Sequence, residues 1–184
     1  DYNLQSVVIE MGQERTSKML ERNELIDLTW RMTSKELESI LQAIYIPLLK
    51  GMMGYRIFII RADDQDRFSK NILLSELKVI PVGQGINWPD TVILKSNNFP
   101  VIQGYYNNLL KMLSKNRFDY FPRGLHEPWS EIQDNHLFIV EKNIALKYHS
   151  PIFFFVNKAN TRLNDRLNLG LTKLIKSGEF NVFF

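Results

Sequence analysis

Residues 54–61 read GYRIFIIR and lead directly into residues 61–71, RADDQDRFSKN. The first segment is rich in β-branched and aromatic residues and is short for a helix, so it favours a strand. The second segment is polar and charged, as expected of a surface connection. Because a new series of strand and helix patterns begins after it, we expect the chain to pass from one compact part to another here.

Strand and helix patterns alternate on both sides of this break. Further strands are expected at 7–9, 25–30, 79–83, 99–103, 117–121, 137–141 and 151–158. Helices are expected at 12–23, 37–44, 89–97, 106–116 and 160–178. Thr33 and Glu36 have the spacing of a capping box, and Gly178 is a C-cap candidate. The alternation predicts an α/β fold with mainly parallel sheets and helices on both faces.

The composition excludes several classes of protein. With 45% apolar residues among 184, the chain can build a packed core. Its net charge of +3 is spread along the chain without a basic run, which argues against a nucleic-acid-binding arm. The absence of cysteine rules out disulfides, thiolate metal sites and cysteine nucleophiles. No apolar run approaches the roughly 20 residues of a membrane span, and the first residues lack a signal-peptide pattern.

Catalytic and cofactor motifs are not found. The three histidines lack metal-ligand spacing, and there is no GxSxG motif. Asp63 and Asp64 lie in the polar connection, where solvation explains them better than acid–base chemistry. Residues 83–85, GQG, form neither a GxGxxG fingerprint nor a Walker motif. We therefore expect no enzyme activity, no cofactor and no metal.

Three loops follow expected strands and are candidates for a binding site: residues 29–36, 83–91 and 120–127. In parallel α/β sheets, ligands bind beyond the carboxyl ends of the strands. Two of these loops precede an expected helix start, where free N–H groups and the helix dipole favour an anion.

The order and spacing of several segments together carry a resemblance. They are TWRMTSKELE (29–38), IPLLKGMMGYRIFIIR (46–61), LKVIPVGQGINWPDTVIL (77–94), LLKMLSKNRFDYFPRGLHE (109–127), PIFFFVNK (151–158) and the last helix with GEFNVFF (178–184). In this order the chain resembles the type 2 periplasmic solute-binding proteins, specifically the family 3 group related to the polar amino-acid-binding proteins of ABC importers. The resemblance extends over essentially the whole chain.

The resemblance implies two α/β lobes joined by two hinge strands, with a ligand cleft between them. Carried over, lobe one comprises residues 1–60 and 152–184, lobe two comprises 61–151, and GYRIFIIR and PIFFFVNK are the crossings. Relatives begin with a signal peptide and a further strand–helix unit, so we expect this chain to be truncated or atypical at its start. The resemblance also implies a periplasmic monomer.

In the first lobe, the resemblance places Trp30, Arg31 and Thr33 at the cleft. Trp30 would stack on an apolar or planar group, and Thr33 would donate to a carboxylate. Alternatively, Trp30 belongs to the core and Thr33 is only the helix cap. The relatives' carboxylate-binding arginine is replaced here within KELE (35–38), which argues for a changed ligand.

In the second lobe, the loop with Tyr120, Arg123 and Glu127 would form a wall of the cleft. Arg123 could grip a carboxylate through a bidentate contact, or it could form a salt bridge with Glu127 or Asp119. Relatives usually have an acidic residue near this loop that meets the ligand's amino group. Here Arg123 and Gly124 occupy that region, which again argues for a changed ligand.

The third loop supplies Gly85, Asn87, Trp88 and Thr91 at a helix start. Glycine allows the backbone to come close to a ligand, and a helix N-terminus favours negative charge. Asp90 already supplies such charge and could simply satisfy the helix end.

Three functions follow from this reading. The first is a solute-binding protein that captures a small polar solute, amino-acid-like or carboxylate-bearing, and presents it to the membrane subunits of an ABC importer. The second is the ligand-sensing domain of a membrane signalling receptor. The third is an enzyme, a dehydratase or lyase, in which Glu127 would be the acid–base residue.

Overall fold

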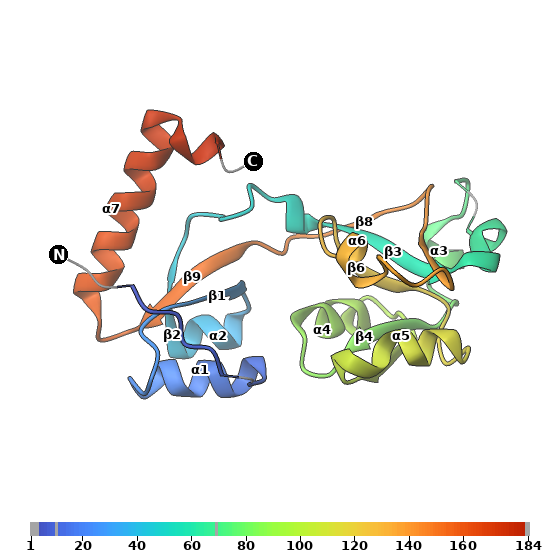
Figure 1. The fold of residues 1–184 in the computed structure, drawn as a ribbon, viewed down its shortest axis with the longest axis horizontal. Helices are drawn as coiled ribbons and strands as arrows, with labels where there is room; N and C mark the ends of the chain where they lie inside the picture. Colours follow the sequence, from blue (N-terminus) through green and yellow to red (C-terminus); the bar gives the residue numbers. More distant parts are fainter. Residues whose placement is uncertain (1–3, 10, 69, 183–184) are drawn as a thin grey trace. The chain divides into compact units, whose positions relative to one another are not determined.

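The computed structural model describes residues 4–9, 11–68 and 70–182, and the chain forms two compact units (Figure 1). Unit 1 is built from residues up to Lys50 and from Pro151 onward, and unit 2 from Gly51–Ser150. The expected boundary at residue 60 falls inside unit 2, because the strand over 55–61 pairs only with strands of that unit. GYRIFIIR is therefore a strand of unit 2 rather than a crossing segment.

The sheet of unit 1 is completed by the part of the chain that returns from unit 2. Its strands are β1 (Thr29–Met32), β2 (Leu41–Ile44) and β9 (Ile152–Asn157). β9 lies between β1 and β2 and runs antiparallel to both (Figure 1). Phe153 and Phe155 of β9 pack with Leu20 and Leu41 in the core of this unit. The core of unit 1 thus depends on residues more than 100 positions apart in the sequence.

The helices of unit 1 confirm two sequence predictions. The helices are α1 (Gln13–Glu21), α2 (Lys35–Ile40), α7 (Thr161–Ser177) and the 3-10 turn η3 (Glu179–Asn181). α1 and α7 occur where helices are expected. Gly178 ends α7 with a φ of 82°, the left-handed conformation of a glycine C-cap.

Three local predictions in unit 1 were wrong. Residues 4–9 form no strand, and Val8 is 93% exposed, because an apolar run becomes a strand only when another strand receives its hydrogen bonds. The remaining residues of the YNLQSVVIE segment, 2–3 and 10, lie outside the described part. The helix expected over 37–44 ends at Ile40, since Leu41 begins a strand that pairs with β9. Its N-cap is Ser34, whose Oγ accepts from the Leu37 N–H at 3.1 Å, and not Thr33.

In unit 2 the strand β3 is buried on both faces. β3 (Tyr55–Arg61) pairs antiparallel with β6 (Phe121–Gly124), β7 (Phe138–Val140) and β8 (Leu146–Lys147). Phe58 and Ile60 point into one core cluster and Ile59 into another. A strand covered on both faces needs a continuous apolar run, which explains the IFII in its sequence.

The expected parallel pairing occurs only in one part of unit 2. β4 (Val82–Gly85) and β5 (Val101–Gly104) are parallel, and a parallel bridge joins Val82 to Tyr120. The α/β class is confirmed, but mainly parallel sheets are not found around β3 and β9. These two strands are the segments expected to cross between the lobes. Each instead lies in the sheet of one unit and pairs with neighbours that run in the opposite direction.

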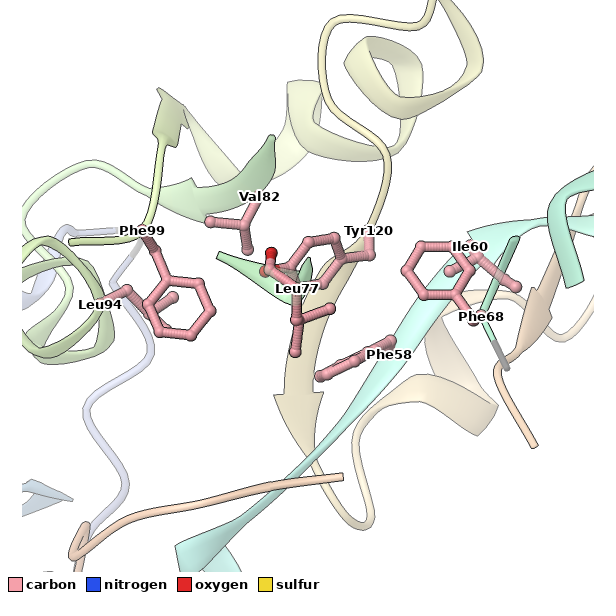
Figure 2. Close-up of a cluster of buried hydrophobic side chains, with 8 residues drawn as sticks. All are labelled: Phe58, Ile60, Phe68, Leu77, Val82, Leu94, Phe99 and Tyr120. Atoms are coloured by element: carbon pink, nitrogen blue, oxygen red, sulfur yellow. The ribbon is translucent and has the colours of Figure 1, made fainter. Parts of the chain in front are cut away.

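The helices of unit 2 confirm the patterns at 89–97 and 106–116. The helices of this unit are η1 (Met52–Gly54), η2 (Ala62–Arg67), α3 (Leu74–Leu77), α4 (Pro89–Ser96), α5 (Tyr106–Ser114) and α6 (Pro128–Glu131). Figure 2 shows the larger core cluster, in which Tyr120 and Phe58 lie near the centre and Leu94 and Phe99 at one end. Among the described residues, no helix is long and apolar enough to cross a membrane.

Candidate functional site

The connection from β4 to α4 is a closely packed turn. Asn87 has a φ of 62°, a left-handed conformation that asparagine tolerates better than most residues. The Thr91 hydroxyl donates to the Gly85 carbonyl at 2.7 Å and is buried there. A Cβ on Gly85 would lie 2.2 Å from the Trp88 ring, so only glycine fits under this indole. Gly85, Trp88 and Thr91 of this loop therefore pack against one another.

The guanidinium of Arg123 lies among aromatic rings. Its Cζ is 4.9 Å from the Trp88 ring centroid, 5.1 Å from that of Phe121 and 5.7 Å from that of Tyr106. Arg123 belongs to β6 and pairs with Ile57, so its backbone is held by the sheet rather than by a loop. A cation over several ring faces is attracted by their quadrupoles. The arginine is thus held by its strand and by these rings.

Glu131 is the main ionic partner of Arg123. Arg123 Nε donates to both Glu131 carboxylate oxygens at 3.0 and 2.9 Å, and Nη2 donates to Oε1 at 2.6 Å. The Tyr106 hydroxyl donates to the same oxygen at 2.9 Å. Burial and this hydrogen bond raise the pKa of Tyr106. Glu131 was not among the residues predicted from the sequence, although it lies four residues after Glu127.

Glu127 is the more accessible of the two carboxylates. Its side chain is 25% exposed, compared with 9% for Glu131. Its Oε1 lies 3.1 Å from Arg123 Nη2, and its Oε2 accepts from the Gly124 N–H at 2.6 Å. The salt bridge between Arg123 and Glu127 that the sequence suggested is present. With two carboxylates around one guanidinium, this group carries a formal net charge of −1.

A second buried network holds the first turn of α4. Arg56 Nε donates to Asp90 Oδ1 at 2.6 Å, and the Arg56 side chain is 2% exposed. The Tyr148 hydroxyl donates to the same Asp90 oxygen, and Arg56 Nη1 donates to the Met53 carbonyl. Burial and the Asp90 charge raise the pKa of Tyr148. From the sequence, Asp90 was expected only to satisfy the helix end, and its partners Arg56 and Tyr148 were not predicted.

Tyr120 lies apart from Arg123, in the core of unit 2. Its ring is fully buried, 4.8 Å from Phe58 and 5.8 Å from Phe68 between centroids (Figure 2). Adjacent strand residues point to opposite faces, so Phe121 reaches Arg123 and Tyr120 does not. The structure therefore places Tyr120 as a packing residue.

The three candidates of unit 1 lie on and after β1. Trp30 is 67% exposed, so it does not fill the core. Arg31 is engaged by α1: Nη1 donates to the Gln13 carbonyl at 2.7 Å and also to the Ser17 hydroxyl, and burial lowers its pKa. The Thr33 hydroxyl donates to Glu38.

The predicted residues form two groups, one in each unit. In unit 2, Gly85, Trp88 and Thr91 lie in the connection from β4 to α4, where the Trp88 ring faces Arg123. Arg123 in turn forms an ion pair with Glu127. Trp30, Arg31 and Thr33 form a separate group in unit 1. Among the described residues, no cluster of three or more His, Cys, Asp or Glu side chains could hold a metal ion.

Comparison with known proteins shows which fold the chain has. No protein-family model matches the chain, and no curated protein sequence matches it. Several solved structures, however, are similar to this one. An amino acid ABC transporter substrate-binding protein from Streptococcus pneumoniae, bound to L-arginine, matches with a TM-score of 0.73 at 13% identity, over 95% of this chain and 72% of that chain.

Two further solved structures have a similar fold. A mutant of the arginine-binding protein from T. maritima matches with a TM-score of 0.66 at 16% identity, over 95% of this chain and 73% of that chain. A histidine kinase sensor domain with similarity to periplasmic binding proteins matches with a TM-score of 0.67 at 15% identity, over 92% of this chain and 72% of that chain. The chain therefore has the fold of the type 2 periplasmic binding proteins, as its sequence predicted.

Proposed function

We propose that this protein is an extracytoplasmic solute-binding protein that captures a small amino-acid-like solute for an ABC importer. The fold supports this class, since the similar structures include amino-acid-binding proteins. The observation that carries the proposal is the group formed by Arg123, Glu127, Trp88 and Tyr106 next to the α4 turn.

The chemistry of this group matches a zwitterionic solute. In the described part of the chain, the hydrogen bonds and ion pairs of Arg123 involve Nε and Nη2 and not Nη1. Nη1 can therefore donate to a solute carboxylate. Glu127, a quarter exposed, can receive a solute ammonium group. The half-exposed Tyr106 ring offers apolar surface beside them.

Unit 1 supplies a further candidate of a different kind. The exposed Trp30 can stack on an apolar or planar part of the solute. The hydrogen bonds of Arg31 to Gln13 and Ser17 assign it to holding α1 on β1, and we propose no solute contact for it.

A thermal-shift screen of L-arginine, L-glutamine, L-glutamate and L-histidine tests the function. A solute at about 100 times its Kd adds about 2.7 kcal/mol to the unfolding free energy. For a protein of this size, this raises Tm by roughly 5–10 °C. A panel of the proteinogenic amino acids that leaves Tm unchanged at millimolar concentration would refute an amino-acid-like solute.

Two variants then test the site. With an amino acid that binds, Glu127→Gln should weaken binding at least tenfold, because a charge-assisted contact is lost. Trp30→Ala should also weaken it, and Trp129→Ala is the matched control, since that tryptophan is 60% exposed and belongs to no proposed contact. Equal affinity of Trp30→Ala and Trp129→Ala would remove Trp30 from the site.

A sensor role is the second candidate, favoured by the similarity to a histidine kinase sensor domain. Cell fractionation of the full-length protein distinguishes the two roles. Release of the protein by osmotic shock supports transport, whereas its retention in the membrane fraction together with an output domain supports sensing.

A further inference from the structure

The two segments that connect unit 2 to unit 1 are joined to each other inside unit 2. One segment follows the boundary at Gly51 and the other precedes the boundary at Ser150. The Ser150 hydroxyl donates to the Met53 carbonyl, and the Tyr148 N–H donates to the Gly54 carbonyl at 2.9 Å. The pairing of β8 with the first residues of β3 extends this connection.

Arg56 and Tyr148 attach these segments to α4. Arg56 lies in β3 just after one boundary, and Tyr148 lies just before the other. Both side chains bond to the same oxygen of Asp90, in the first turn of α4. The Arg56 guanidinium also lies 5.3 Å from the Tyr148 ring centroid. One buried carboxylate therefore holds both connecting segments.

The start of α4, with Trp88 at its N-cap and Asp90 in its first turn, also carries part of the proposed solute site. Asp90 lies two residues after Trp88, whose ring covers Gly85 and faces Arg123. A shift of this turn must move Asp90, and Asp90 cannot move without breaking its bonds to Arg56 and Tyr148 or carrying both segments with it.

We propose that Arg56, Asp90 and Tyr148 form a clasp that couples the start of α4 to the two connecting segments. Through this clasp, the position of the α4 turn biases how the two units move relative to one another. The coupling is a property of the protein without solute. It extends the proposed function, because solute bound at the turn would act on the units through the same three residues.

Single-molecule energy transfer in the absence of any solute tests the clasp. Because the chain has no cysteine, Glu24→Cys and Lys111→Cys, both exposed and in different units, allow specific labelling. Tyr148→Phe removes one hydroxyl from the clasp. Tyr120→Phe removes a buried tyrosine hydroxyl from the core of the same unit and is the matched control.

We expect Tyr148→Phe to change the distribution of distances between the units, and Tyr120→Phe to leave it unchanged. Hydrogen exchange of amides 51–56 should become at least about tenfold faster in Tyr148→Phe, since a hydrogen bond to a charged acceptor is lost. If Tyr148→Phe is not folded, Asp90→Asn replaces it, because it removes the charge that Arg56 and Tyr148 both contact.

Identical distance distributions in Tyr148→Phe, Tyr120→Phe and the parent protein would overturn the clasp, even if Tyr148→Phe lowers stability. Because no solute is used, this outcome is independent of the thermal-shift screen. A screen without any binding amino acid refutes the proposed function and leaves the coupling measurement valid.

Discussion

Replacing Glu131 by Gln tests whether this residue, rather than Glu127, holds Arg123. Glu131→Gln removes the charge that receives three hydrogen bonds from the guanidinium and one from Tyr106. The side chains of Arg123 and Glu131 are 11% and 9% exposed. Losing one partner of a buried pair costs about 3–5 kcal/mol when the other charge is left alone.

Two features of the structure reduce this cost. Glu127 stays 3.1 Å from the guanidinium, so Arg123 keeps a counter-charge. The Gln amide also retains one oxygen that can accept a hydrogen bond. We therefore expect Glu131→Gln to lower the free energy of unfolding by about 2–3 kcal/mol. Glu127→Gln, at a more exposed carboxylate, should cost about 1 kcal/mol or less.

Urea denaturation measures both values. With an m value of about 2 kcal/mol/M, Glu131→Gln should lower the midpoint by about 1–1.5 M and Glu127→Gln by at most about 0.5 M. Fluorescence and circular dichroism should be followed together, because a chain with two compact units can unfold in more than one step. The reasoning fails if Glu127→Gln costs as much as Glu131→Gln.

Three other predictions concern stability. Gly83→Ala should lower the free energy of unfolding by about 1–3 kcal/mol, because the new Cβ would lie 2.2 Å from the Phe118 ring. Gly170→Ala, in open space on α7, should raise the free energy of unfolding by about 0.5–1 kcal/mol. The urea midpoints of the two variants test this difference. Phe58→Ala should cost about 3–5 kcal/mol by the same assay, since this ring is fully buried in the core of Figure 2, and a loss below about 1 kcal/mol would contradict that packing. Because the pKa of Tyr148 is raised, the folded state keeps the phenol proton above pH about 10, where an unfolded tyrosine loses it. The free energy of unfolding should therefore fall as pH rises beyond this value, and it should fall less steeply in Tyr148→Phe. Equal pH slopes of the two proteins in urea titrations would contradict this prediction.

Much of the fold was predictable because it is written in local patterns. The β-branched run at 55–61, the amphipathic spacing of α5 and α7 and the glycine after α7 each specify an element through interactions between near neighbours. The order and spacing of several motifs also predicted the type 2 binding-protein fold. Arg123 and Trp88 were selected as candidates from their place after a strand and at a helix start, and their contact with a solute stays a prediction.

What pairs with each element was decided only by the tertiary structure. Leu41–Ile44 has helical spacing but is a strand, since its backbone bonds to β9 from the other end of the chain. The pairing of Asp90 with Arg56 and Tyr148 depends on how α4 meets β3 and the segment after β8, and no sequence spacing specifies this. A sequence therefore determines where a charge or a ring occurs along the chain. Whether that group faces solvent, a core or a counter-charge depends on contacts between distant segments, which form only when the chain folds.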